Sequence, residues 1–425
     1  MNFAALKYKL REKETPVYSW LCIGIIYTLF TWSLANSILC ITLAAYWLFI
    51  SKKRFSFSMP GSRLVILFIS VYILAIIGML YTSNIPEGIF RLQQKLGLIM
   101  FPVIFGTTNV VNYGFLKKIS IHFIVGLALT CSMGLGYYFF MTVVSNGGSM
   151  VTTQDLILFE DTQPYTVGLY CLTGIVLILY NEQVRDSLRK NMQYFLITLF
   201  SVFIFLISVR LIVACWILIA LVFILDHIKS VLYRIIAGLV MVSIVITAVG
   251  IIPALNRQWR ELSGGGNENV IVLDQDASLG KSWGGKAIRL AIWSCSKDIL
   301  QNYWLIGVGT GDVQDNLQVA YEKRKFYFAS RYNRYNAHNQ YLQLWIGNGI
   351  VSALLLTACL IFPLFLLFRK NALKSPYTFF LIFSALIFFT ESIFETNKGI
   401  IWYSFFNSIF AFTYLYKPKA DLKII

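Results

Sequence analysis

Long apolar blocks separated by short polar stretches recur from one end of this chain to the other. A helix that crosses a bilayer needs about 20 predominantly apolar residues, and blocks of this size therefore predict membrane spans. The pattern predicts an all-α integral membrane protein with about 12 transmembrane helices and a large, partly helical loop between the ninth and tenth. The predicted spans lie near residues 17–33, 35–50, 64–82, 97–113, 119–143, 165–181, 192–208, 211–226, 235–253, 341–368, 377–394 and 399–416.

The long loop, residues 254–340, separates nine predicted spans in residues 1–253 from three spans and a tail in residues 341–425. It begins with a Gly- and Asn-rich stretch at 263–267 that continues to Gly284-Gly285, and we expect this stretch to be mobile. From Lys286 to Leu300 the apolar residues repeat at helical spacing, which predicts an amphipathic helix at the membrane surface. A second helix follows a glycine turn, and the chain re-enters the membrane just past His338. The apolar positions of this second helix are Val313, Leu317, Ala320 and Tyr321.

Basic residues fix the expected orientation, because Lys and Arg in short loops collect on the cytoplasmic side. With both termini cytoplasmic, the inside segments hold 21 of the 36 Lys and Arg residues and the short outside loops hold four. We therefore expect a multi-pass membrane protein with both termini in the cytoplasm and the long loop on the non-cytoplasmic face. The four outside residues are Arg91, Lys95, Arg210 and Lys398.

Composition narrows the function classes. Hydrophobic residues make up 57% of the chain and charged residues only 13%, so lipid is the solvent for most of it. The net charge of +16 lies mainly beside the membrane, which argues against nucleic acid as a partner. Seven scattered cysteines and three distant histidines predict neither a disulfide framework nor a metal site, and we expect no cofactor.

The outer face of a membrane offers no ATP, so an enzyme there needs a substrate that arrives activated, typically a sugar chain on a lipid pyrophosphate. Such a donor requires fixed cations, for which arginine is well suited, and transfer to a hydroxyl requires a general base such as histidine. His338 is the histidine expected on the outer face, although it could merely cap the tenth span. Arg210 lies between two apolar runs, where the alternative is snorkelling to lipid phosphates. Arg289 lies on the amphipathic helix and, taken alone, fits a solvated or lipid-bound side chain better than a catalytic one.

Several further residues are weaker candidates. Arg331 and Arg334 precede His338 and are further cationic candidates. Glu391 and Glu395 are spaced one helical turn apart at the outer end of the eleventh span, so they are expected to share a face. These two carboxylates could bind sugar hydroxyls, assist the base or form a salt bridge with Lys398.

Two further motifs resemble a phosphate loop and a metal site but do not fit either one well. The stretch Gly307-Val308-Gly309-Thr310-Gly311 lacks the Gly-Lys-Ser/Thr ending of a phosphate loop, and a tight turn before a helix is the better interpretation. The acidic pair in Asp274-Gln275-Asp276 resembles a metal-binding motif of glycosyltransferases but falls in the glycine-rich stretch, whereas a metal site needs ligands on rigid elements.

The block Ala337-His338-Asn339-Gln340-Tyr341-Leu342, followed by Gly349 and preceded by the 307–311 glycine stretch, resembles the O-antigen ligase and polymerase superfamily of bacterial membrane glycosyltransferases. The resemblance covers residues 200 to 400 in motifs and the first half in hydropathy alone. It implies transfer of a glycan from undecaprenyl pyrophosphate to an acceptor hydroxyl at the periplasmic face of the bacterial inner membrane, without metal or nucleotide sugar. The family's motif histidine falls on His338, and its two arginines fall on Arg210 and Arg289.

The sequence departs from the family pattern in two places. Ser352 stands where the family often has a second glycine, and Val209 and Leu211 replace the small or hydroxylated residues usual beside the first arginine. Serine at 352 still allows close helix packing. The His-Asn element is intact.

The sequence therefore predicts an O-antigen ligase that transfers a polysaccharide from undecaprenyl pyrophosphate to the lipid A core oligosaccharide at the periplasmic face, with inversion at the anomeric carbon. The expected catalytic base is His338, and the expected pyrophosphate ligands are Arg210 and Arg289. The candidate supporting residues are Asn339, Arg334, Glu391 and Glu395. The alternatives are an O-antigen polymerase using the same donor, a protein-glycosylating relative, a transporter or flippase for a polyprenyl-linked glycan, and a structural scaffold.

Overall fold

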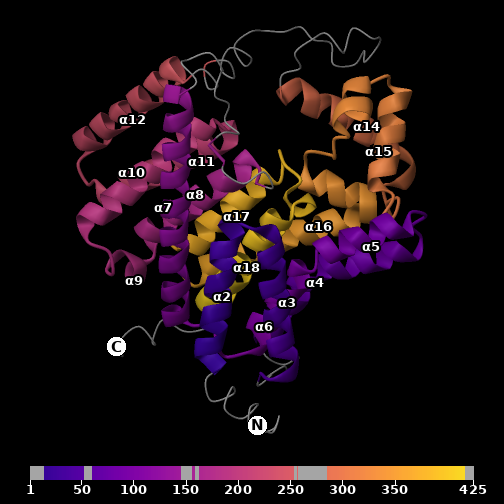
Figure 1. The fold of residues 1–425 in the computed structure, drawn as a ribbon, viewed down its shortest axis with the longest axis horizontal. Coiled ribbons are helices and arrows are strands. Elements are labelled where there is room, and N and C mark those ends of the chain that lie inside the picture. The colour runs from indigo at the N-terminus through magenta and orange to yellow at the C-terminus, as the bar shows by residue number, and fades with distance from the viewer. Residues whose placement is uncertain are drawn as a thin grey trace.

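A computed structural model describes residues 14–51, 60–144, 156–157, 162–252, 256 and 285–416. Within these ranges the regular elements are helices (Figure 1). The Gly- and Asn-rich stretch of the long loop and the acidic pair at 274–276 lie outside the described residues. The helices are α2 (Glu14–Phe30), α3 (Ser33–Phe49), α4 (Pro60–Ile77), η1 (Gly78–Leu80), α5 (Ile85–Gln94), α6 (Gly97–Thr107), α7 (Tyr113–Val144), α8 (Pro164–Tyr180), α9 (Glu182–Arg185), α10 (Lys190–Ile207), α11 (Arg210–His227), α12 (Val231–Ile251), α14 (Gly285–Tyr303), α15 (Val313–Lys323), η3 (Phe328–Asn333), α16 (Gln340–Arg369), α17 (Pro376–Ile387), η4 (Ile393–Glu395) and α18 (Asn397–Tyr414).

The helices confirm an all-α protein built for a membrane. Seven segments of the described chain are long and apolar enough to cross a bilayer, and four shorter apolar helices accompany them. Each predicted span overlaps a helix, and the total of twelve crossings stays a prediction. The long candidates are 61–80, 85–107, 113–141, 190–207, 210–227, 231–251 and 340–369, and the shorter helices are 15–30, 33–49, 164–180 and 376–387.

Helix α18 lies at the centre of the bundle. Every residue from Lys398 to Thr413 is buried, and the helix packs against α2, α6, α7 and α17. Because protein rather than lipid surrounds it, α18 can carry polar residues such as Asn407, whose Oδ1 accepts a 2.9 Å hydrogen bond from the Tyr377 hydroxyl. Its aromatic rings, including Trp402, Phe406 and Phe410, pack edge-on or tilted against neighbouring rings and fill the core.

Helices α14 and α15 form a smaller layer with its own core. The apolar positions predicted from the sequence, including Ala291, Cys295 and Leu317, are buried in one cluster with Ile346 of α16. A bidentate ion pair at 2.6 and 2.7 Å joins Asp298 of α14 to Arg324, the residue that follows α15. Figure 1 shows this layer beside the start of α16. The helix predicted from Lys286 to Leu300 is present as α14, and its apolar face packs against protein. Its position at the membrane surface stays a prediction.

The glycine stretch 307–311 attaches this layer to the bundle. Helix α16 has a break at Asn348 and Gly349, and the backbone of the glycine stretch fills it, with Val308 N donating to Ile346 O at 2.8 Å and Gly309 N donating to Gly347 O at 2.9 Å. At Gly349, with φ of 75°, a Cβ atom would lie 2.0 Å from Leu305 O. The glycines therefore permit a close backbone approach, and the interpretation of this motif as a structural turn is confirmed.

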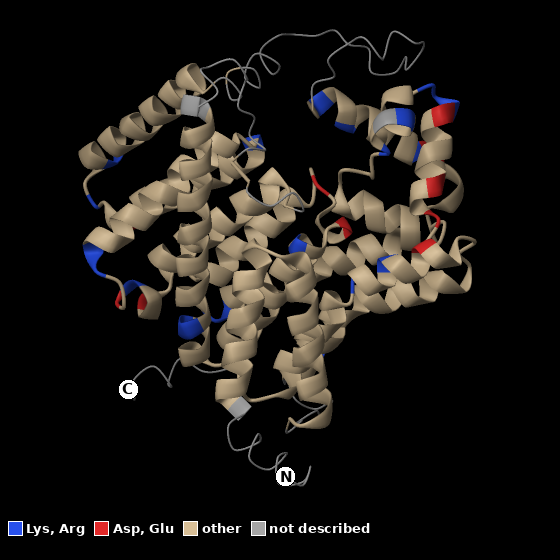
Figure 2. Cartoon of the chain, in the orientation of Figure 1, with Lys and Arg blue, Asp and Glu red and all other residues tan. Residues whose placement is uncertain are grey.

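Helix α16 also defines two faces of the molecule. It runs from just after His338 at one face, through the break at Asn348 and Gly349, to the α16–α17 link at the other. We call these the His338 face and the opposite face. In Figure 2 most of the coloured charged residues lie at helix ends and in the α14–α15 layer, while the middle of the bundle is largely uncharged. This distribution is typical of a protein embedded in a bilayer.

Candidate active site

The candidate base lies in a short strained segment before α16. His338 has φ of 43°, in the left-handed region, and its backbone N–H donates to Asn336 Oδ1 at 2.9 Å. The next residue, Asn339, caps α16 by accepting a 3.0 Å hydrogen bond from Leu342 N. Left-handed backbone costs a bulky residue about 1–3 kcal/mol and persists where surrounding contacts hold it. The role of Asn339 in this structure is thus to start the helix and hold His338 at its entrance.

Those surrounding contacts come from the segment after α17. Gln340 N donates to Phe388 O at 2.7 Å, and Gln340 Oε1 accepts from Phe394 N at 2.6 Å. Asn339 N donates to Ser392 Oγ at 3.2 Å. The start of α16 is therefore fixed against residues 388–394, which places Glu391 beside His338.

Glu391 joins two of the residues predicted from the sequence. Its Oε1 lies 2.5 Å from Arg289 Nη2, and its Oε2 lies 3.3 Å from His338 Nδ1. The Glu391 side chain is 11% exposed, against 25% for His338 and 30% for Arg289. One well-buried carboxylate therefore holds the candidate base and a candidate phosphate ligand, each of which remains accessible.

The contact with Glu391 favours one tautomer of the His338 imidazole. A carboxylate only accepts hydrogen bonds, so the bond requires the proton of a neutral His338 to lie on Nδ1. Nε2 then carries the lone pair and can accept a proton from a substrate hydroxyl. The pair has the arrangement expected of a general base oriented by an acid partner.

Arg289 is fixed by three hydrogen bonds. Its Nε donates to Thr390 O at 2.9 Å, its Nη1 to Gly285 O at 3.2 Å and its Nη2 to Glu391 Oε1. A guanidinium has more N–H groups than these bonds use, so it can still donate to an anionic ligand. This arrangement favours phosphate recognition by a preorganised fork over a mobile, solvated side chain.

Arg210 is the first residue of α11 and follows a two-residue link after α10. Ser208 takes a left-handed conformation with φ of 59°, and Val209 is extended, so the two helices form a tight hairpin. Helix α11 packs against α17, and an ion pair of 2.8 Å between Asp226 and Lys374 ties the end of α11 to the start of α17. The two helices therefore run in opposite directions, and Arg210 lies at the face where α17 ends before Glu391.

The other acidic and basic candidates on this face have separate positions. Glu395 contacts Arg91 at 2.9 Å and Lys95 at 2.8 Å, both near the end of α5. The prediction that Glu391 and Glu395 share a helical face is wrong, because α17 ends at Ile387 and Glu395 belongs to the separate short helix η4. The Lys398 ammonium donates to Thr162 Oγ1 at 2.5 Å.

The two arginines before His338 differ in their surroundings. The Arg331 guanidinium carbon lies 4.0 Å from the centre of the Tyr327 ring, and Arg331 Nε lies 3.8 Å from Glu322 Oε1. Its contacts are therefore made around η3. Arg334 is exposed and has φ of 44°, and its supporting role stays a prediction. Within the described residues, no group of three or more His, Cys, Asp or Glu side chains could hold a metal ion.

Comparison with known protein families supports the sequence resemblance. The O-antigen ligase family matches residues 195–357, which is less than half of the chain and includes Arg210, Arg289 and His338. No curated protein matches the chain. The resemblance to this family is thereby confirmed, whereas Glu391 lies beyond the matched residues and was recognised as the bridging group from the tertiary structure alone.

Proposed function

From the match to the O-antigen ligase family, which indicates a membrane glycosyltransferase of ligase type, we propose that this protein transfers a polysaccharide from undecaprenyl pyrophosphate to the lipid A core oligosaccharide. The family match and the apolar helices support an inner-membrane, multi-pass protein. The basic-residue bias of the sequence supports an orientation with the His338 face in the periplasm and both termini in the cytoplasm. The donor, the acceptor and this orientation are parts of the proposal.

His338 acts as the general base. Its Nε2 takes the proton of the acceptor hydroxyl while that oxygen bonds to the anomeric carbon of the donor sugar. The bond between the anomeric carbon and the pyrophosphate oxygen breaks, and its electron pair leaves with undecaprenyl pyrophosphate. Direct displacement inverts the anomeric centre.

The charges of the cluster formed by Arg289, Glu391 and His338 suit this reaction. Before transfer, the positive Arg289 and negative Glu391 balance beside a neutral His338. After His338 takes the proton, the cluster is positive while negative charge grows on the leaving pyrophosphate. Arg210 adds a second cation at the N-terminus of α11, where the helix dipole also favours anions. Such fixed donors typically stabilise a developing charge by about 3–4 kcal/mol each.

One observation carries this proposal. Glu391 contacts Arg289 and His338, which are 102 and 53 positions away in the sequence, and thereby assembles a base, its orienting acid and a phosphate ligand at one point. A scaffold would not require this arrangement. A transporter would be expected to show broken helices that line an ion path, but the break in α16 is filled by the glycine stretch.

The test is the lipopolysaccharide profile of a deletion strain complemented with wild type, His338→Ala or His227→Ala. His227 is a matched control, because it is exposed and its Nδ1 lies 3.1 Å from Phe223 O in its own helix. We expect wild type and His227→Ala to restore long chains on lipid A core. His338→Ala should leave polymer of normal length on the undecaprenyl carrier.

The same profile separates the alternatives. Accumulation or transfer of single repeat units would identify a polymerase, because polymerisation precedes attachment to the core. An unchanged profile in the deletion strain would refute both activities for this glycan.

A further inference from the structure

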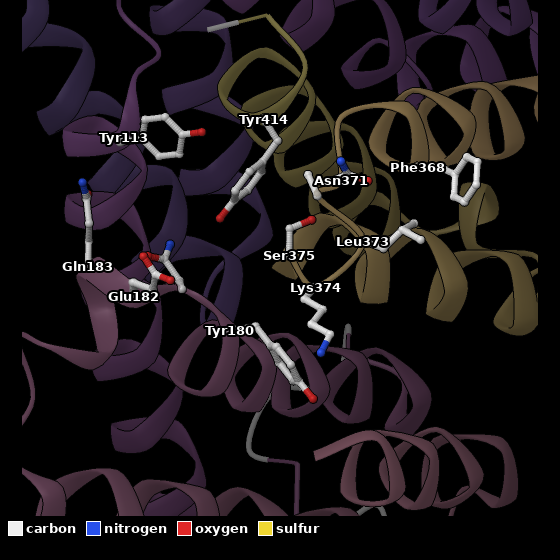
Figure 3. A pocket seen from close by; sticks show the side chains of 12 residues that line it. Tyr113, Tyr180, Glu182, Gln183, Phe368, Asn371, Leu373, Lys374, Ser375 and Tyr414 are labelled. Carbon is white, nitrogen blue, oxygen red and sulfur yellow. The ribbon is translucent and has the colours of Figure 1, made fainter. Parts of the chain in front are cut away.

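A cavity opens on the opposite face, far from His338. It has a volume of about 480 Å³ and lies where several helices end together. Tyr113 begins α7, Tyr180 ends α8, Tyr414 ends α18, and the link between α16 and α17 forms another side (Figure 3). The lining residues are Tyr113, Tyr180, Asn181, Glu182, Gln183, Phe368, Asn371, Ala372, Leu373, Lys374, Ser375 and Tyr414.

Opposite charges stand on different sides of this cavity. Figure 3 shows Glu182 and Gln183 on one side and Lys374 and Ser375 on the other, with the Tyr414 side chain between them. The Lys374 side chain is 73% exposed, so its ammonium can bind a further anion while it contacts Asp226 at 2.8 Å. The cavity can therefore bind a group that carries both a positive and a negative charge.

The tyrosine rings favour an organic cation on the Glu182 side. Tyr113 and Tyr414 pack edge to face with ring centres 5.9 Å apart. Tyrosine faces attract ammonium groups, and a carboxylate beside them adds a direct ion pair. The anionic part of the ligand would then lie toward Lys374.

An apolar path leads from the cavity along the outside of α16. Phe368, at the edge of the cavity, is 64% exposed, and Leu373 is 41% exposed. Phe365, Ile361 and Leu354 continue the exposed apolar residues up the same helix at spacings of three, four and seven residues. Acyl chains lying along this face would place their headgroup at the cavity.

We propose that this cavity binds a zwitterionic glycerophospholipid of the leaflet on that side, with its phosphate at Lys374 and its ammonium at Glu182, Tyr113 and Tyr414. The positive-inside bias assigns this leaflet to the cytoplasmic side. The site is separate from the reaction at His338, and the proposal does not depend on the identity of the glycan acceptor.

The experiment measures lipid binding to the purified, delipidated full chain by native mass spectrometry. Phosphatidylethanolamine is compared with phosphatidylglycerol of the same acyl chains, which has no ammonium group. Glu182→Gln keeps the side-chain size and leaves the Lys374–Asp226 ion pair in place. Asp186→Asn is the matched control, because Asp186 is exposed near the same short helix and does not line the cavity.

We expect wild type and Asp186→Asn to bind phosphatidylethanolamine more tightly than phosphatidylglycerol. Glu182→Gln should lower the affinity for phosphatidylethanolamine by about threefold to tenfold and abolish the preference, because it removes the partner of the ammonium. Competition by free phosphoethanolamine would support the same headgroup chemistry and show that a soluble ligand can supply it. Equal binding of both lipids by wild type, or an unchanged preference in Glu182→Gln, would overturn the proposal.

Discussion

Replacing Glu391 with glutamine tests whether this carboxylate acts through His338. The amide oxygen of the introduced side chain could still accept the Nδ1–H of the imidazole, so the substitution removes charge with little change of shape. During the proposed reaction His338 becomes an imidazolium whose Nδ1 lies 3.3 Å from a carboxylate oxygen. Glu391→Gln removes the attraction that stabilises this positive charge.

The magnitude follows from the geometry. At an effective dielectric constant of about 20, opposite unit charges separated by about 4 Å attract by ~4 kcal/mol. Arg289, held at 2.5 Å by the other carboxylate oxygen, repels the imidazolium and cancels part of this attraction. Solvent reduces it further, since His338 is 25% exposed. A net loss of ~2 kcal/mol predicts a decrease in kcat of about 30-fold.

The assay is transfer by purified protein in nanodiscs, with lipid-linked polysaccharide as donor and lipid A core as acceptor. A positioning role predicts a lower kcat with little change in the KM for acceptor, and partial recovery in Glu391→Asp, which retains the charge. Glu322→Gln is the control, because Glu322 is 46% exposed and contacts Arg331 rather than the site. A folded Glu391→Gln variant with more than half of the wild-type kcat would refute the reasoning.

Three further predictions follow from local geometry. Arg289→Lys should lower kcat/KM for the donor by about tenfold or more, because a lysine keeps the charge but not the planar fork; steady-state kinetics would show it, and an unchanged value would exclude Arg289 from phosphate binding. Gly349→Ala should destabilise the protein by ~2–4 kcal/mol and lower its Tm, because a Cβ at this position would lie 2.0 Å from Leu305 O at a φ of 75°. Gly238→Ala is the control: a Cβ there would meet nothing within 4 Å, so the Tm should stay unchanged or rise slightly. Burial raises the pKa of the Cys295 thiol to about 12, so the thiol stays protonated at pH 8 and should react with a soluble maleimide only after denaturation; rapid labelling of the native protein would contradict its burial.

Much of the helical architecture could be predicted because helices depend on local pattern. Apolar blocks gave the positions of the membrane helices, and the 3.6-residue period gave the buried face of α14, including Ala291 and Cys295. The chemistry of a charged lipid-linked donor also directed attention to Arg289 and His338. Both side chains are accessible and lie within the residues matched by the family, and their roles stay predictions.

The assembly of the site depended on tertiary structure. The spacing of Glu391 and Glu395 suggested one shared helical face, but α17 ends early, and packing directs the first carboxylate to His338 and the second to Arg91. Likewise, the sequence of the glycine stretch at 307–311 predicted a turn, but it did not predict that this turn would pack into the break of α16. Sequence periodicity reports neighbours within one or two helical turns. Contacts between residues 53 or 102 positions apart arise only when whole helices pack, and packing decided which charges meet.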